Sequence, residues 1–272
     1  MTSTDLMHTA PATRSTLPDR TGAGPLATAR AFVRRSVRQS LRDGESLVMA
    51  IVLPVMLMLL FTFVFGGAIE PDGGYVTYVV PGTILLCAGF GASSVAVAVS
   101  RDVTSGAMGR FRTLPIASPL VLVGHVVASV LRNLMATVIV IGVGMAIGFR
   151  PTASPMEWLG AAALVALYIL AITCLFAVIG LVAGSPENAN GYGFVLLFLP
   201  YVSSAFVPVS TMPTWMTGCA EHQPITPITE TLRYLLTGVG QASWPAALAW
   251  CLGAVVLAGI LAAVLLPRKL RG

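Results

Sequence analysis

The chain has 272 residues, of which 56% are hydrophobic and only 10% are charged, and its formal net charge is +5 at pH 7. Its mean hydropathy is +0.85. This composition exceeds what the core of a water-soluble protein of this length requires, and it excludes an ordinary soluble globular domain. We therefore expect a polytopic membrane protein, in which many apolar side chains face lipid.

The N-terminal part of the chain divides into two segments. Residues 1–25 are rich in Thr, Ala, Pro and Gly, which predicts a disordered tail, and they lack the apolar run of a cleavable signal peptide. Residues 26–44 carry apolar positions on one helical arc and arginines on the adjoining arc. A basic amphipathic helix of this kind lies in the headgroup plane, which predicts an interfacial elbow helix. The simpler alternative is that these arginines only set the orientation of the chain.

Six apolar stretches follow, each close to the about 20 residues that a helix needs to cross a bilayer. They occupy residues 47–68, 78–100, 121–149, 158–183, 191–209 and 245–267. Backbone groups in lipid must be paired internally, and the stretches show no strand alternation, so they predict helices. The predicted fold class is all-α, with six transmembrane helices in one domain over residues 45–272.

Basic residues gather at alternate gaps between these stretches. Eleven of them precede the first stretch, separate the second from the third, or follow the sixth: Arg30, Arg34, Arg35, Arg38, Arg42, Arg101, Arg110, Arg112, Arg268, Lys269 and Arg271. The positive-inside rule then predicts that both termini are cytoplasmic. The gap at 184–190 has no basic residue, and only the count of crossings assigns this gap to the cytoplasmic side.

The sequence lacks the residues that several classes of function need. The only Lys is Lys269, so the chain has no Gly-Lys-Ser/Thr phosphate loop and is not expected to hydrolyse ATP. The centres of the stretches contain no Asp or Glu, which disfavours coupling to an ion gradient. Cys219 and His222 form a lone C-x-x-H pair, short of the four ligands of a zinc site. We expect no enzyme, no metal and no cofactor bound by this chain.

An intramembrane hydrolase would need a nucleophile and a base within the membrane. Ser93 and Ser94, with His125 as the nearest histidine in sequence, offer the candidates. The favoured alternative is that these serines are small residues that let two helices approach closely.

The segment 101–119, between the second and third stretches, combines an apolar knob with a basic rim. A short helix that ends before Pro115 would present Met108, Phe111 and Leu114 beside Arg101, Arg110 and Arg112. This combination suits docking into a groove on another protein. The alternative is that the arginines only anchor a cytoplasmic loop.

Prolines and aromatic residues mark the later part of the domain. Residues 210–243 are too polar and too rich in proline to span, which predicts short helices that re-enter the outer leaflet and cap an exit. Pro54, Pro200 and Pro208 predict kinks in the first and fifth stretches. A soft, aromatic pathway surface is predicted there, for an apolar cation or a lipid tail: Met58, Phe61, Phe65, Phe194, Phe198 and Tyr201. Lipid contact or packing is the alternative for these residues.

Arg132 is the one charge inside a stretch. It is expected either to lie near the inner interface by snorkelling or to act as a gate.

Three segments resemble the permeases of the ABC type-2 exporters, and within them the daunorubicin-resistance-like permeases of actinobacteria. The first is similar to the family's Arg-acidic…Gly…Arg…Leu-Pro segment and contains Arg101, Asp102, Gly106, Arg112, Leu114 and Pro115. The second, at 185–190, resembles a Ser-x-Glu-x-Ala-x turn before the fifth span. The third and most specific runs through 204–215 and 223–227 to 232–238. The chain departs from the pattern at Asp102, where Glu is more common, and at Ser105, where Gly followed by Thr is usual.

The resemblance implies a transmembrane permease subunit that moves amphipathic drugs or lipids outward across a bacterial plasma membrane. It implies pairing with a second permease, identical or paralogous, on two ATP-binding subunits that hold ATP and Mg, and it implies no nucleic-acid partner. The loop that docks on those subunits would be the coupling helix, with these residues: Arg101, Asp102, Gly106, Met108, Arg110, Phe111, Arg112, Leu114 and Pro115. The alternative function is a polytopic scaffold or assembly factor that does not transport.

Overall fold

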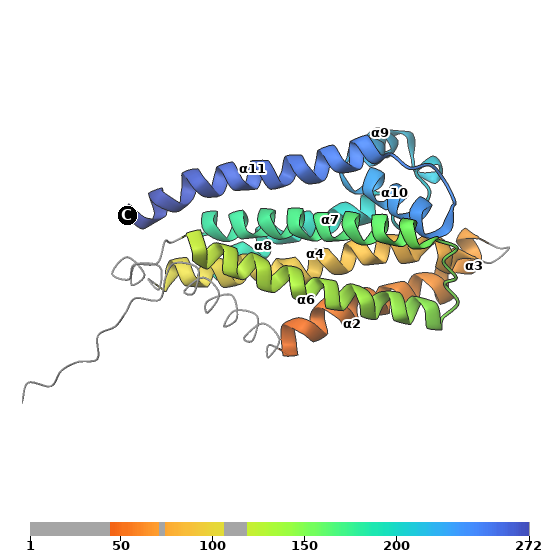
Figure 1. The fold of residues 1–272 in the computed structure, drawn as a ribbon, viewed down its shortest axis with the longest axis horizontal. Coiled ribbons are helices and arrows are strands. Elements are labelled where there is room, and N and C mark those ends of the chain that lie inside the picture. Colours follow the sequence, from red (N-terminus) through yellow and green to blue (C-terminus); the bar gives the residue numbers. More distant parts are fainter. Residues whose placement is uncertain (1–43, 71–73, 106–118, 272) are drawn as a thin grey trace, which may run out of the picture.

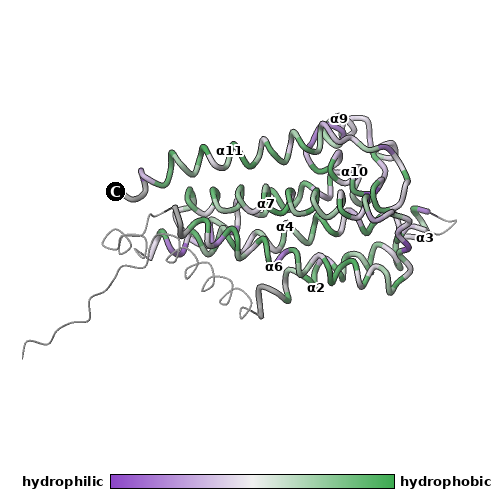
Figure 2. Tube along the Cα trace, in the orientation of Figure 1, coloured by the Kyte–Doolittle hydropathy of each residue, from purple (hydrophilic) through white to green (hydrophobic). Residues whose placement is uncertain are grey.

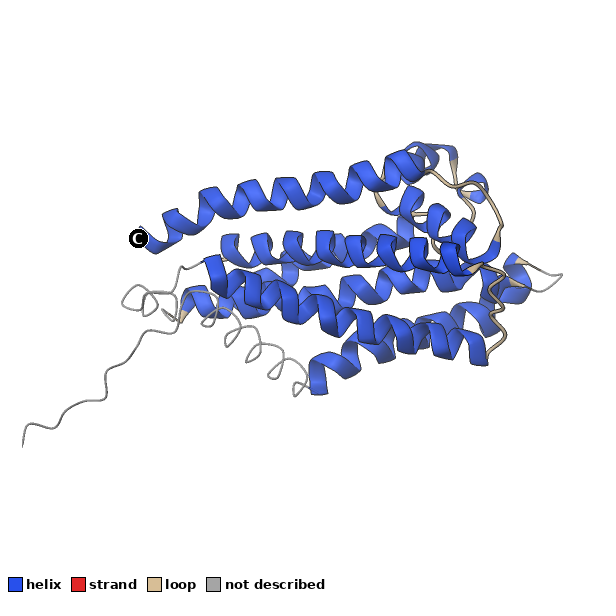
Figure 3. Cartoon of the chain, viewed as in Figure 1, coloured by secondary structure: helices blue, strands red, loops and turns tan. Residues whose placement is uncertain are grey.

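The computed structural model describes residues 44–70, 74–105 and 119–271, and within these ranges every regular element is a helix (Figure 3). The long helices are α2 (Gly44–Leu60), α4 (Tyr75–Thr104), α6 (Pro119–Ala146), α7 (Pro155–Val182) and α11 (Trp244–Arg271). The shorter elements are η1 (Phe61–Phe65), α3 (Gly66–Ile69), α8 (Pro186–Phe198), η3 (Leu199–Val202), η4 (Val209–Thr211), α9 (Thr214–His222) and α10 (Ile225–Thr237). The predicted tail at 1–25 and elbow at 26–44 lie outside the described residues, except for Gly44 at the start of α2.

Within the described ranges, five helical segments are long and apolar enough to cross a membrane. They are Ala50–Ile69, Tyr75–Thr104, Leu122–Ala146, Pro155–Val182 and Trp244–Arg268. Figure 2 shows hydrophobic residues along most of their length. The prediction of an all-α, multi-pass membrane protein is therefore confirmed, and five of the six predicted stretches correspond to single long segments.

The remaining predicted stretch, 191–209, is not one regular helix. It starts earlier than expected, at α8, where the Ser185 hydroxyl accepts a hydrogen bond from the Asn188 N–H at 3.2 Å and caps the first turn. The α-helix ends at Phe198, because Pro200 has no N–H to donate and the chain continues as the tighter turn η3. By their helical rises α8 and η3 together extend about 28 Å, close to the hydrocarbon thickness of about 30 Å. The fifth stretch therefore breaks at Pro200 instead of kinking.

Helix α4 forms the centre of the bundle and α11 its periphery (Figure 1). In the most apolar window of α4, 72% of the residues are buried, against 11% for α11. Helices α2, α6, α7 and α8 all pack on α4, whereas α11 contacts α7 and α10. The end of α4, the start of α6 and the C-terminus lie at one end of the bundle, and α3, α9 and α10 lie at the other (Figure 1).

The backbone beyond η3 is irregular over residues 203–208, which we name the break segment. The carbonyl of Ser204 accepts hydrogen bonds from the Arg233 guanidinium at 2.7 Å and from the Tyr78 hydroxyl at 2.8 Å. The carbonyl of Phe206 accepts one from the Tyr75 hydroxyl at 2.6 Å. Protein groups therefore satisfy these carbonyls where the backbone is irregular, as buried backbone groups require.

Arg233 is the centre of this arrangement. It is buried in α10, its Nε donates to the Tyr78 carbonyl at 3.3 Å, and its Cζ lies 3.8 Å from the centroid of the Tyr78 ring. Burial lowers the pKa of the guanidinium, but arginine remains protonated because its ordinary pKa exceeds 12. A single buried cation thus joins α10, α4 and the break segment.

We expect the substitution Arg233→Met to destabilise the protein by about 1–3 kcal/mol, because it leaves buried carbonyls with fewer donors. The Arg150→Met variant is the matched control, since Arg150 is exposed and water can replace its bonds to the carbonyls of Met145 and Phe149. Thermal unfolding in detergent, followed by the monodisperse fraction on size exclusion, measures both variants. Equal midpoints for the two variants would contradict this role of Arg233.

Gly82 lets α4 approach the break segment. A Cβ at this position would lie 2.4 Å from the carbonyl oxygen of Ala205 and 2.7 Å from its Cβ, contacts too short to exist without a backbone shift. We expect Gly82→Ala to cost about 1–3 kcal/mol by overpacking. Gly142→Ala on α6 is the control, because a Cβ there meets nothing within 4 Å. Chemical denaturation in mixed micelles compares the two, and a wild-type midpoint for Gly82→Ala would contradict the expected clash.

Candidate functional site

The predicted coupling segment is described only at its first residues. Arg101 is exposed at the end of α4, and the Asp102 carboxylate lies next to it in sequence. Its Oδ2 is 2.8 Å from Nε2 of His125, which connects α4 to α6 at the point where the chain leaves the bundle. The other predicted coupling residues lie outside the described ranges: Gly106, Met108, Arg110, Phe111, Arg112, Leu114 and Pro115.

The contact between His125 and Asp102 also argues against the alternative of an intramembrane hydrolase. The hydroxyl of Ser93 donates to the Phe90 carbonyl at 2.7 Å, and that of Ser94 donates to the Gly91 carbonyl at 3.0 Å. The partner of His125 is Asp102, about 12 Å further along α4 than Ser94 by the helical rise. The structure does not bring His125 to either serine, so no nucleophile–base pair forms among Ser93, Ser94 and His125.

Arg132 is buried at the middle of α6, about 20 Å from either end of the helix. Its Nη2 donates to the Gly91 carbonyl on α4 at 2.7 Å and also to the Ser94 hydroxyl. The side chain thus turns into the bundle and does not snorkel to the interface. An ionisable group held inside a membrane domain is a candidate functional residue.

Asn133 follows Arg132 and is also buried against α4. Its Nδ2 donates to the Ser129 hydroxyl at 3.4 Å, one turn earlier on α6. A Cβ on Gly91 would lie 1.5 Å from Oδ1 of Asn133, so only glycine allows the two helices to approach this closely here. We name Gly91, Ser94, Ser129, Arg132 and Asn133 the mid-bundle polar cluster.

Five of the six predicted pathway residues lie in one continuous aromatic row. Ring centroids are separated by 4.8 Å between Phe194 and Phe198 and by 5.9 Å between Phe198 and Tyr201. The row then crosses Phe206, 5.3 Å from Tyr201 and 4.8 Å from Phe61. It ends at Phe65, 5.6 Å from Phe61. The aromatic row therefore connects α8 and η3 with η1.

Sequence reasoning missed Phe206, the buried ring that joins the two halves of the row. Phe206 lies inside the most specific family-like segment, at 204–215. The motif therefore marked this position, but it did not indicate that Phe206 joins the row. Met58, the sixth predicted pathway residue, is fully buried in the hydrophobic core and is not part of the row. The ends of the row at Phe65 and Phe194 are exposed on the surface of this chain.

The comparisons with known proteins agree with the fold and with the resemblance. The sequence model of the family described as "ABC-2 type transporter" matches residues 28–237, which include the break segment and the aromatic row. The "Daunorubicin resistance ABC transporter permease protein DrrB1" of Streptomyces coeruleorubidus is 28% identical over 214 residues, which cover 78% of this chain and 75% of the relative. The "Probable doxorubicin resistance ABC transporter permease protein DrrC" of Mycobacterium tuberculosis is 24% identical over 243 residues, which cover 82% and 87%.

These relatives are named as permeases, so the expectation of a transport subunit and not an enzyme is confirmed, with ATP hydrolysis on a separate subunit. The apolar helices make the chain a multi-pass membrane protein. The family match extends from before α2 to the end of α10. The chain belongs to the ABC-2 type transporter family, as the transmembrane permease subunit of an ABC exporter.

Proposed function

We propose that this chain exports amphipathic drugs or lipids across a bacterial plasma membrane, together with a second permease, identical or paralogous. Two ATP-binding subunits, which hold ATP and Mg, drive the cycle from the cytoplasmic side, where both termini lie. The relatives' names, which refer to daunorubicin and doxorubicin resistance, support the drug class. The basic residues at alternate gaps support the orientation.

The aromatic row is the observation that best supports the proposed class of substrate. Aromatic faces attract an apolar cation, and their large apolar area accommodates the rest of an amphipathic molecule. The row begins on exposed Phe194, passes buried Phe206 and reaches exposed Phe65, so a substrate can exchange contact with lipid for contact with protein along it. Its rings come from two separate parts of the chain, which allows the surface to open and close between them.

Helices α4 and α6 are the proposed transmission elements. The coupling segment begins at Arg101 and Asp102, and the hydrogen bond between Asp102 and His125 joins the two helices at that end. The bond of Arg132 to the Gly91 carbonyl joins them again at their middle. A displacement of the coupling segment by the ATP-binding subunit therefore moves α4 and α6 as a pair. The short helices in 210–243 would cap the exit at the other end.

Acidic substitutions on the predicted apolar knob test the coupling role. We expect Met108→Asp and Phe111→Asp to weaken binding of the ATP-binding subunit about 30-fold, the effect of losing a hot spot of about 2 kcal/mol. Thr214→Asp, on exposed α9 at the opposite end of the bundle, is the control. Co-purification and drug-stimulated ATP hydrolysis in liposomes measure the effect. Unchanged hydrolysis and resistance in the knob variants would favour the scaffold alternative.

A truncation on the exposed part of the aromatic row tests the pathway. We expect Phe198→Ala to raise the drug concentration for half-maximal stimulation of ATP hydrolysis by about tenfold, since one cation–π and stacking contact is worth about 1 kcal/mol or more. Val195→Ala changes a more exposed neighbour on α8 that is outside the row, and it should leave this concentration unchanged. Equal drug responses for both variants would remove the aromatic row from the pathway.

A further inference from the structure

A second feature of the bundle lies apart from the aromatic row. A cavity of about 470 Å³ lies between α7, α10 and α11, with Leu196 of α8 and Leu199 of η3 at its side. None of the rings of the aromatic row lines it. A volume of this size is in the range of small-molecule sites and is far larger than the voids of an ordinary packed interior.

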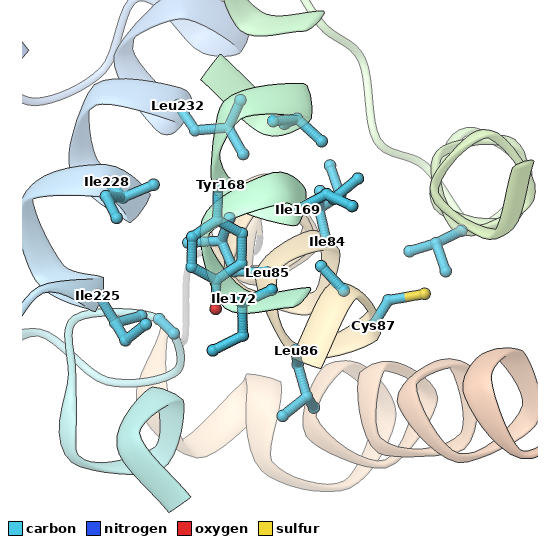
Figure 4. Packing of buried hydrophobic residues seen from close by; sticks show 14 of the residues in the cluster. Ile84, Leu85, Leu86, Cys87, Tyr168, Ile169, Ile172, Ile225, Ile228 and Leu232 are labelled. Atoms are coloured by element: carbon cyan, nitrogen blue, oxygen red, sulfur yellow. The ribbon is translucent and has the colours of Figure 1, made fainter. Parts of the chain in front are cut away.

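The lining of this cavity is almost wholly apolar. Figure 4 shows Ile225 and Ile228 of α10 facing Tyr168 and Ile172 of α7, which form its inner wall. Only Tyr168, Trp250 and Cys251 in the lining carry a side-chain group able to form a hydrogen bond, and none carries a charge. An ion or a sugar would lose its hydration there without compensation, and water would find few partners. The occupant must therefore be a hydrocarbon group.

The cavity opens toward the bilayer. Trp250 and Leu257 line it and are also 46% and 53% exposed on the surface of α11. Next to them, α11 contributes small residues to the lining, among them Ala249, Gly253 and Ala254. These small side chains leave the space open, and α11 is the least buried of the membrane-spanning segments. A molecule within the bilayer can thus enter sideways, past α11.

The length of the cavity matches one leaflet. Its lining on α11 runs from Ala246 to Leu257, about 16 Å along the helix, and half of the hydrocarbon thickness is about 15 Å. The Ala246 end lies close to Trp244, the first residue of α11, where an indole is suited to the membrane interface. The Leu257 end lies at the middle of α11.

We propose that this cavity binds one acyl chain of a bilayer phospholipid, whose headgroup lies at the end of the bundle formed by α9 and α10. The chain fills the space between α11 and α7 and restores the dispersion contacts that an empty cavity would forfeit. An amphipathic cation is a poorer occupant, because the lining has no acidic side chain and offers only the rings of Tyr168 and Trp250, fewer than the aromatic row. The site is independent of the proposed export pathway and of the ATP-binding subunit.

Photolabelling tests the proposal with the purified full chain in phosphatidylcholine–phosphatidylglycerol vesicles. The probe is a phosphatidylcholine with a diazirine on its acyl chain, either near the carbonyl or near the terminal methyl. We expect labels on Ile172 and Ile228, which are 7% and 2% exposed and out of reach for lipid that only surrounds the protein. The probe with the diazirine near the carbonyl should label the Ala246 end of the lining on α11, and the terminal probe should label the Leu257 end.

A matched pair of glycine variants tests the same site. A Cβ at Gly253 or at Gly259 on α11 would meet nothing within 4 Å, but only Gly253 lines the cavity. We expect Gly253→Phe to lower the labelling of Ile172 and Ile228 about tenfold by filling the space, and Gly259→Phe to leave it unchanged.

Three outcomes would overturn the proposal. The first is an absence of label on Ile172 and Ile228 in the wild-type chain, a result that does not depend on the folding of any variant. The second is an equal loss of label in the Gly253→Phe and Gly259→Phe variants. The third is labelling of these two residues by a photoactivatable amphipathic cation and not by the lipid, which would make the cavity a drug site.

Discussion

The hydrogen bonds that satisfy the break segment at 203–208 are the interaction on which the rest of the structure depends. A buried chain that leaves its helix needs other groups to pair its backbone carbonyls. Tyr75 and Tyr78 supply donors from the first turn of α4, and Arg233 supplies one from α10. Because these donors come from two helices, the end of α8, the start of α4 and the position of α10 are fixed together. The aromatic row is fixed with them, since Phe206 belongs to the same segment.

The same requirement explains the contact between α4 and α6. A buried guanidinium at the middle of α6 is costly in lipid, and Arg132 is stabilised by bonds to the Gly91 carbonyl and the Ser94 hydroxyl. Such bonds need a short distance between the backbones, which Gly91 provides by leaving room for Asn133. Small residues and polar residues in these two helices are therefore parts of one contact. The small residues permit the close approach, and the polar residues form the hydrogen bonds that stabilise it.

Hydropathy and charge predicted the membrane class and five long segments, because these properties depend on composition over about 20 residues. The end of α8 was predicted only as a kink, since Pro200 marks a lost donor but not where the freed carbonyls find partners. Arg233 and the Tyr78 carbonyl are 155 positions apart in the sequence, and no local sequence pattern predicts a contact over such a separation. The aromatic residues were predicted from type alone, and their order in a row came from the structure. The apolar cavity had no sequence signal, because alanine and glycine on α11 are equally typical of tight packing.

Helix α4 links the two ends of the molecule. Its last turns carry Arg101 and Asp102, with the bond to His125, and its first turn carries the tyrosines that bond the break segment. These two sites are about 40 Å apart along one uninterrupted helix. The mid-bundle polar cluster joins the middle of this helix to α6. Under the proposed function, a displacement imposed near Asp102 therefore moves α4 together with α6. The tyrosines at the other end of α4 would carry the break segment and Phe206 with them, which links the coupling end of the helix to the aromatic row.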